Sequence, residues 1–172
     1  KQVQNSPIAA DILASAEQRL QVMARIHRRL YDADIVNKPA SKQFQDLCTD
    51  ILDASGAKNI VCIVEVGAVS LDLTRLVTIS LLVTELVTNA IKHAFTPGDG
   101  GTIVLRLTHE EQSYVLSVSD NGRGMQRDIA RTDGLGVTLV SSLAHQLRGE
   151  VAYAGAPGGG TQIVVRFPAK AA

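Results

Sequence analysis

Four polar side chains recur at three- and four-residue spacing in one apolar stretch of the chain, ELVTNAIKHAF at residues 85–95. They are a carboxylate, an amide, an ammonium and an imidazole, from Glu85, Asn89, Lys92 and His93. At about 100° per residue, they fall within roughly a 100° arc of a helix. Such a set can hold a hydrated divalent cation and the oxygens of a polyphosphate, with Asn89 as the metal ligand, because magnesium prefers oxygen ligands and keeps several waters.

In this interpretation Lys92 offers a point charge to phosphate, and Glu85 orients a water molecule or accepts a proton. The alternative is a solvated face, because most polar stripes on helices meet only water. For His93 alone, a surface or packing role explains the residue as well as ligand contact does. The opposite side of the predicted helix is apolar: Ile79, Val83, Leu86, Val87 and Ala90.

A second candidate site is the segment SVSDNGRGM, which places Asp120 at the end of a predicted strand, directly before Gly122 and Gly124. Asp-Asn-Gly is typical of a hairpin turn. No alternating strand follows Met125, so a loop whose glycines let a flat ligand approach the backbone is the competing interpretation. In that loop the Asp120 carboxylate can accept a hydrogen bond from an exocyclic amine, the group that distinguishes adenine.

Two further glycine clusters lie at predicted element boundaries. DGLGVTLV has Gly134 and Gly136 directly before a helix, where free backbone N–H groups and the helix dipole favour an anion such as phosphate. A flexible loop is the alternative. PGGGTQIVV has glycines at 158–160 before Thr161, and an ordinary hairpin turn is the alternative there. Neither cluster matches a P-loop or a dinucleotide-binding G-x-G-x-x-G motif.

The elements that would position these residues follow from apolar periodicity. Helices are predicted at residues 8–31, from about Phe44 to Gly56, from Asp72 or Thr74 to about Phe95, and from Leu139 to a stop at Gly149. Strands are predicted from Asn59, on both sides of a turn near Glu110 and Glu111, and in EVAYAG and TQIVVRFP. The sum is an α/β (α+β) two-layer sandwich with a mostly antiparallel mixed sheet and helices on one face.

Composition narrows the function classes further. The chain has 17 basic and 17 acidic residues in 172, so no charge excess indicates nucleic acid or an anionic membrane. The stretch Leu76–Leu86 is too short and too polar to predict a membrane span. Cys48 and Cys62 lack metal-ligand spacing, which predicts buried free thiols in a reducing compartment. Because the chain starts at Lys1 without a signal-peptide pattern, we expect it to be part of a longer protein.

In this order the motifs E-L-V-x-N-A-I-K-H-A-F, S-D-N-G-R-G-M, G-L-G-V-x-L-V and G-G-G-T resemble the ATP-binding domain of sensor histidine kinases. This is the Bergerat or GHKL fold, also used by gyrase and heat-shock chaperone ATPases. The resemblance covers about residues 40–168 and implies the cofactors ATP and Mg²⁺. It further implies a response regulator as partner, an upstream sensor domain, homodimerisation through a helical hairpin, and a cytoplasmic location.

The resemblance also implies roles for single residues. In the kinase family's pattern, the first motif supplies a magnesium ligand (Asn89), phosphate and nucleotide contacts (Lys92, His93) and a catalytic or water-orienting carboxylate (Glu85). The remaining motifs read adenine through Asp120, Gly122 and Gly124, hold the phosphates with Gly134, Leu135 and Gly136, and close the adenine side with Thr161.

The His-Ala-Phe ending and the short segment between Gly124 and Gly134 resemble the kinase subfamily with a His-Arg-Val-Lys-Asn-type acceptor motif, but the chain lacks that motif. AEQRLQVMARIHRRLY instead resembles the second helix of the dimerisation hairpin, with His27 at a non-acceptor position. We therefore expect residues 1–36 to be part of a dimerisation segment, with the acceptor helix missing, and residues 40–172 to be the ATP-binding domain. The short lid also lacks the phenylalanine-containing box of larger histidine kinases.

Two other functions fit the same residues. One is a serine-kinase anti-sigma factor on the same fold. The other is a nucleotide-binding or phosphorelay adaptor without catalysis, although such an adaptor would have no need of Glu85, Asn89 and Asp120.

Overall fold

The computed structural model describes residues 38–96, 98–124 and 135–170, and also Glu17, Leu20, Gln21 and Ala24. Contacts divide the chain into two units, residues 1–37 and 38–172. The four described residues of the first unit are helical and fall within the helix predicted at 8–31. The rest of that helix, His27 included, lies outside the described residues.

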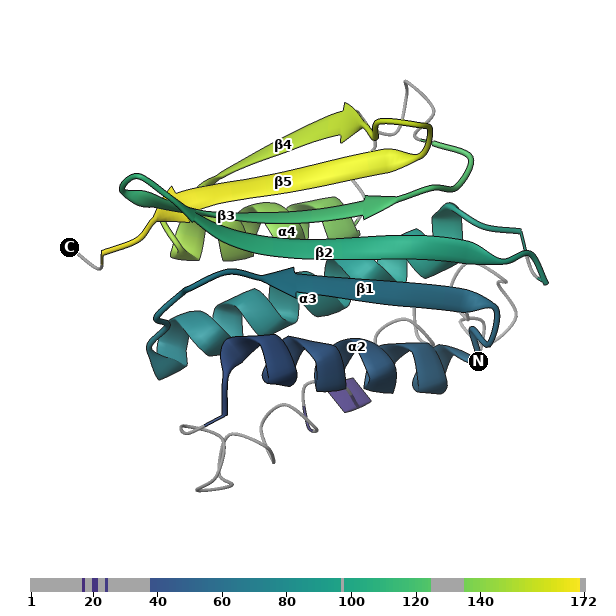
Figure 1. The fold of residues 1–172 in the computed structure, drawn as a ribbon, viewed down its shortest axis with the longest axis horizontal. Coiled ribbons are helices and arrows are strands. Elements are labelled where there is room, and N and C mark those ends of the chain that lie inside the picture. Colours follow the sequence, from purple (N-terminus) through teal and green to yellow (C-terminus); the bar gives the residue numbers. More distant parts are fainter. Residues whose placement is uncertain are drawn as a thin grey trace, which may run out of the picture. The chain divides into compact units, whose positions relative to one another are not determined.

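The described part of the second unit is a two-layer α/β sandwich, with helices covering one face of a mixed sheet (Figure 1). The helices are α2 (Ala40–Ser55), α3 (Leu73–His93) and α4 (Leu135–Gln146), and the strands are β1 (Ile60–Val66), β2 (Gly101–Glu110), β3 (Ser113–Asp120), β4 (Glu150–Gly155) and β5 (Thr161–Pro168). The strand order is β1-β2-β3-β5-β4. Among the strands of the described ranges, only the β1–β2 pair is parallel, so the predicted fold class is confirmed.

Helix α2 is amphipathic and ends where the sequence predicts. Gly56 adopts φ 64°, the left-handed conformation that a glycine C-cap favours. Its apolar stripe is buried: Phe44, Leu47, Cys48 and Ile51. Cys48 and Cys62 on β1 are both buried and free, as predicted. The hydrogen bond between the two thiols, reinforced by burial, raises the pKa of Cys48 far above its usual value, while the same hydrogen bond lowers the pKa of Cys62.

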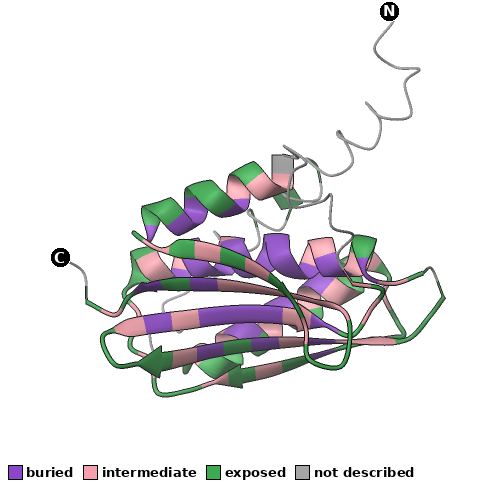
Figure 2. Ribbon diagram, turned by 90° about the horizontal axis from the view of Figure 1, so that it is seen from above, coloured by how far each residue is buried: buried purple, intermediate pink, exposed green. Residues whose placement is uncertain are grey.

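Helix α3 begins at the Asp72 cap, whose Oδ1 accepts a hydrogen bond from the Arg75 N–H at 2.8 Å. Its predicted apolar side is buried throughout, but so are Thr78, Ser80 and Thr84. The reason is that α3 packs against both α2 and α4 as well as the sheet, so its burial extends around the helix (Figure 2). By length and mean hydropathy (1.3) α3 could cross a membrane, but 56% of that window is buried inside the fold, as in a core helix.

Helix α4 stops before Gly149, as predicted, and the Gly149 N–H donates to the Ala144 carbonyl at 2.8 Å. The left-handed residue after the helix is Arg148, at φ 56°. Glycine is needed at 149 for another reason, because a Cβ there would lie 2.6 Å from the Arg166 carbonyl oxygen on β5. The predicted turns of the two hairpins are confirmed, with Glu111 at φ 53° between β2 and β3 and positive-φ glycines at 158–160 between β4 and β5.

Candidate functional site

The site is built around Asp120, the last residue of β3, whose side chain is only 8% exposed. Its Oδ1 accepts two backbone hydrogen bonds, from Gly122 N–H at 3.0 Å and from Thr161 N–H at 3.2 Å. These bonds fix the carboxylate at the end of the strand. No hydrogen bond to Oδ2 is formed within the described part of the chain, so this second oxygen is left to accept from a ligand.

Two glycines allow the backbone segments of the site to approach one another. A Cβ on Gly160 would lie 1.9 Å from the Asp120 carbonyl oxygen, and a Cβ on Gly122 would lie 2.2 Å from the Ala94 carbonyl oxygen. Both distances are far below any contact that a side chain can make. Gly124 contributes a positive φ of 77°. Only glycine is therefore compatible with this packing at 122 and 160.

The loop after β3 is also tied to the carboxyl end of α3. Arg123 donates its backbone N–H to the Ala94 carbonyl at 2.9 Å and its Nε to the His93 carbonyl. Asn121 exchanges two hydrogen bonds with the backbone of Thr102 on β2, through its own N–H and through Oδ1 at 2.7 Å. The end of α3, the loop at 121–124 and the start of β5 thus converge.

The four polar residues of α3 differ in exposure. Glu85 is 2% exposed, Asn89 is half-buried, and Lys92 and His93 are exposed. The predicted stripe therefore runs from the interior, at Glu85, to the surface at the end of the helix that meets the loop at 121–124. Simple solvation is excluded for Glu85. Lys92 and His93 lie in the last turn of α3, where basic residues also interact favourably with the helix dipole.

The described side chains offer few ligands for a metal ion at this site. No group of three or more His, Cys, Asp or Glu side chains that could hold a metal occurs among the described residues. A divalent cation near Asn89 would take one amide oxygen from the protein and its other ligands from phosphate and water. That sparse set fits magnesium, which commonly keeps several waters and binds with substrate phosphates.

The start of α4 differs from the prediction by one turn. The helix begins at Leu135, whose side chain is not described, so Gly136 is its second residue and not part of the preceding loop. The first four N–H groups of a helix have no partner within it, and Gly136 still belongs to that set. Gly134 and the predicted lid at Arg127–Asp133 lie outside the described residues.

Sequence reasoning missed several residues of this region. Gly160 was predicted only as part of a glycine cluster, and Arg123 and Asn121 only as letters of a motif. The motifs indicated the positions of these residues but not their contacts. Nothing in the sequence indicated Ala94, because it contributes a carbonyl oxygen that any residue would carry.

The fold and this site define an ATPase domain of the histidine kinase type. Residues 74–171 match the family described as histidine kinase-, DNA gyrase B-, and HSP90-like ATPase. The match spans more than half of the chain, so the chain belongs to this family. Family membership of this kind implies ATP binding.

Individual relatives point to sensor kinases. The chain is 32% identical over 102 residues to the sensor histidine kinase PdtaS of Mycolicibacterium smegmatis, covering 57% of the chain and 20% of that protein. It is 29% identical over 83 residues to the nitrate/nitrite sensor protein NarX of Escherichia coli K12, covering 48% and 13%. The chain thus spans a fifth or less of these relatives' length.

Solved structures agree on the fold. The blue-light activated histidine kinase of Erythrobacter litoralis EL346 superposes with a TM-score of 0.78 and 25% identity, covering 97% of this chain and 52% of that one. The separate histidine kinase domain of the same protein gives a TM-score of 0.75 at 23% identity, covering 94% and 84%.

Proposed function

We propose that this domain binds Mg-ATP and transfers its γ-phosphoryl group to a histidine imidazole, for relay to an aspartate of a response regulator. The observation that carries the proposal is the buried Asp120 carboxylate, with Oδ1 held by two backbone N–H groups and Oδ2 directed to no protein donor among the described residues. A fixed, dehydrated acceptor beside glycine backbone suits the exocyclic amine of adenine.

Adenine would lie where the end of α3, the loop at 121–124 and the start of β5 meet. Asp120 would accept the amine hydrogen bond, and Gly122, Gly124 and Thr161 would close around the ring. Because Gly122 packs directly on the Ala94 carbonyl, adenine bound at Asp120 would lie next to the carboxyl end of α3.

The phosphates would extend from this point along α3 and towards the start of α4. Asn89 would hold magnesium, which neutralises charge on the phosphate oxygens. Lys92 and His93 would contact the nucleotide from the exposed end of the helix, and Gly134, Leu135 and Gly136 would offer backbone N–H groups. Positioning and charge neutralisation dominate in phosphoryl transfer, so little covalent work falls to the protein.

In the transfer step an imidazole nitrogen forms the new P–N bond as the γ-phosphorus–oxygen bond to ADP breaks. The proton of that imidazole must leave, and in this proposal Glu85 would receive or orient it. Its burial, at 2% exposure, keeps it away from bulk water, which disfavours competing hydrolysis.

The acceptor histidine would belong to the dimerisation hairpin of a longer, cytoplasmic, sensor-linked homodimer. Residues 1–36 would form part of that hairpin. Leu20, one of the four described helical residues of the first unit, is 66% exposed. The apolar stripe predicted for residues 8–31 would suit a homodimeric four-helix arrangement.

Calorimetric titration with Mg-ATP tests the nucleotide site. Asp120→Asn keeps the shape of the side chain but replaces one acceptor oxygen by a donor, so we expect affinity to fall by about ten- to a hundredfold. Asp53→Asn, an equal charge change at an exposed position of α2, is the matched control and should bind like the unmodified chain. Equal affinities for all three proteins would overturn the assignment of Asp120.

Transfer is tested with ATP labelled at the γ-phosphate and an acceptor helix supplied in trans. Label on histidine, which is lost in acid and kept in base, supports the proposal. Phosphoserine on a partner would instead favour the anti-sigma kinase, and nucleotide binding with no transfer to any substrate would favour the adaptor.

A further inference from the structure

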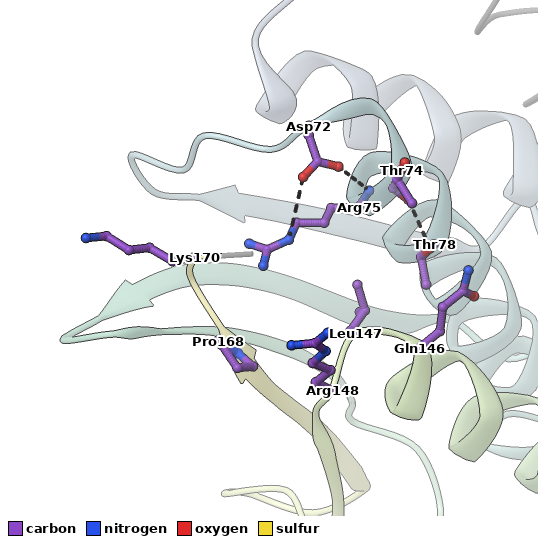
Figure 3. Close-up of a pocket in the computed structure, with 9 residues that line it drawn as sticks. All are labelled: Asp72, Thr74, Arg75, Thr78, Gln146, Leu147, Arg148, Pro168 and Lys170. Atoms are coloured by element: carbon purple, nitrogen blue, oxygen red, sulfur yellow. Dashed lines mark hydrogen bonds and ion pairs between the residues drawn. The ribbon is translucent and has the colours of Figure 1, made fainter. Parts of the chain in front are cut away.

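A separate cavity of about 330 Å³ opens beside the amino end of α3, where the carboxyl ends of α4 and β5 also arrive (Figure 3). Its lining includes three cationic side chains and one carboxylate. The residues that line it are Asp72, Thr74, Arg75, Thr78, Gln146, Leu147, Arg148, Pro168 and Lys170.

This cavity lies far from the Asp120 site. Arg75 and Asn89 are 14 residues apart on one helix, which corresponds to about 21 Å at 1.5 Å per residue. On the sheet, Pro168 pairs with Ser113, the first residue of β3, whereas Asp120 is the last. The two sites therefore occupy opposite ends of the same helices and strands.

The cavity carries an excess of positive charge. The lining has three cations, from Arg75, Arg148 and Lys170, and one carboxylate, from Asp72. That carboxylate is already engaged, since Oδ1 caps the Arg75 N–H and Oδ2 lies 3.7 Å from the Arg75 Nε. The amino end of α3 and the carboxyl end of α4 bring opposite partial charges that offset each other, so the side chains decide the sign.

The three cations are held differently. Arg75 donates from Nη1 to the Ala169 carbonyl, and its side chain is 13% exposed, so it forms a fixed wall. Arg148 and Lys170 are exposed, and neither side chain makes an ion pair or hydrogen bond in the described ranges. They are free to turn towards a bound anion without first breaking another contact.

The backbone at Arg148 supplies an independent observation. Its φ of 56° lies in the left-handed region, which costs a non-glycine residue about 1–2 kcal/mol. Glycine or asparagine would occupy this position after a helix with less strain. The left-handed residue closes the end of α4, since the Arg148 N–H donates to the His145 carbonyl and the Gly149 N–H to the Ala144 carbonyl. An arginine kept at this position adds a guanidinium to the lining of the cavity.

We propose that this cavity binds a small organic anion with at least two negative charges, such as a phosphorylated or polycarboxylic metabolite. Its volume of about 330 Å³ is at the low end of the roughly 300–1,000 Å³ of ligand pockets, which favours a metabolite smaller than a nucleotide. Leu147 and Pro168 supply a small apolar surface for the carbon skeleton. Arg148 and Lys170 take the charged groups, and Arg75 adds a fixed positive charge to the wall. This inference does not depend on the proposed kinase activity.

NMR titration of the whole chain with citrate and, separately, with inorganic phosphate tests the proposal. We expect amide shifts to concentrate at Thr74, Thr78, Gln146 and Leu147, and to be equal in Asp120→Asn, which disables the nucleotide site. Shifts at Asn121–Gly124 that disappear in Asp120→Asn would place the anion in the nucleotide site and overturn the proposal. If inorganic phosphate saturated the shifts at these residues and citrate caused none, the cavity would be a free-phosphate site, which would also contradict the proposal.

Charge variants provide the second arm. Arg148→Asn removes the guanidinium but keeps a residue that tolerates the left-handed conformation, so the fold should be retained while citrate affinity falls about tenfold. Lys170→Gln should lower affinity in the same direction. Lys58→Gln removes an exposed charge outside the cavity and should change affinity less than about twofold. Equal losses in all three variants would show a non-specific charge effect and refute the site.

Discussion

At the scale of single residues, Gly158 and Gly160 form a natural comparison. Their φ angles are nearly the same, +89° and +88°, but a Cβ at 158 would meet nothing within 4 Å, whereas one at 160 would lie 1.9 Å from the Asp120 carbonyl oxygen. Gly158→Ala should therefore lower the free energy of unfolding by only the left-handed strain, about 1 kcal/mol. Gly160→Ala should lower it by about 3 kcal/mol or more, because the clash adds to the strain.

Urea unfolding of the two glycine variants measures this difference, and Mg-ATP titration shows whether the site is affected. We expect Gly158→Ala to bind normally and Gly160→Ala to bind weakly. Two variants with the same stability and the same affinity would mean that the contact of Gly160 with Asp120 is not tight in solution.

Tyr153 and Tyr114 differ in whether the hydroxyl group is hydrogen-bonded. The Tyr153 hydroxyl is buried and has no hydrogen-bond partner among the residues that the structure describes, while the Tyr114 hydroxyl bonds to the backbone N–H and carbonyl of Ser70. Removing an unsatisfied buried hydroxyl relieves a desolvation penalty, so Tyr153→Phe should stabilise the fold by about 1 kcal/mol. Tyr114→Phe should destabilise it by about the same amount. A loss of stability in Tyr153→Phe would contradict the buried, unpaired state.

The same tyrosine predicts a pH dependence. Burial raises the folded-state pKa of Tyr153 above its usual 10.0. A raised pKa means that the folded state holds the proton more tightly than the unfolded state does. The free energy of unfolding of the unmodified protein is therefore unaffected by this group below the unfolded-state pKa, and it falls as the pH rises above that pKa and the unfolded state loses the proton first. The advantage of Tyr153→Phe in urea unfolding should therefore grow between pH 8 and about pH 11. An advantage that is constant over that range would contradict the shift.

Residue types predicted which side chains to examine but not how they meet. Asp120, Gly122 and Thr161 carry recognisable chemistry, and the structure joins them by hydrogen bonds. Ala94 acts through its carbonyl oxygen, which has no residue-type signal. The need for glycine at 160 depends on the position of Asp120 on another strand, so no local pattern could reveal it.

At the scale of elements, α3 depends on its amino-terminal cap. Asp72 accepts from the Arg75 N–H, and replacing an N-cap Asp by Ala costs about 1 kcal/mol. Asn caps about as well as Asp, and the exposed ion pair with Arg75 contributes little. Asp72→Ala should therefore lower the free energy of unfolding by about 1 kcal/mol and Asp72→Asn by much less, as measured in urea. Equal losses would assign the effect to charge and not to capping.

Local sequence patterns predicted where helices and turns lie better than they predicted which side chains other elements bury. Gly56 and the hairpin turns are set by neighbouring residues, and they were found. The burial of Thr78 and Thr84 was not, because it depends on α2 and α4 packing on both flanks of α3. Both hydroxyls donate to the carbonyl four residues earlier, which satisfies them and makes this burial tolerable.

At the scale of the whole chain, the second unit contains the contacts that form the core of the sheet and helices. Its contacts separate from those of residues 1–37, and its core is formed from α2 through β5. The family match begins only at residue 74, yet α2 packs on both α3 and β1. It buries three large apolar side chains in the core: Phe44, Leu47 and Ile51.

A fragment of residues 38–172 should therefore unfold cooperatively and bind Mg-ATP within about twofold of the whole chain. A fragment of residues 70–172, close to the family match, should not fold, since losing α2 and β1 exposes one flank of α3 and the edge of β2. Thermal unfolding and Mg-ATP calorimetry on both fragments measure the difference. Cooperative unfolding and nucleotide binding by the shorter fragment would show that α2 and β1 are dispensable. Failure of the longer one to fold would show that residues 1–37 contribute to the stability of the second unit.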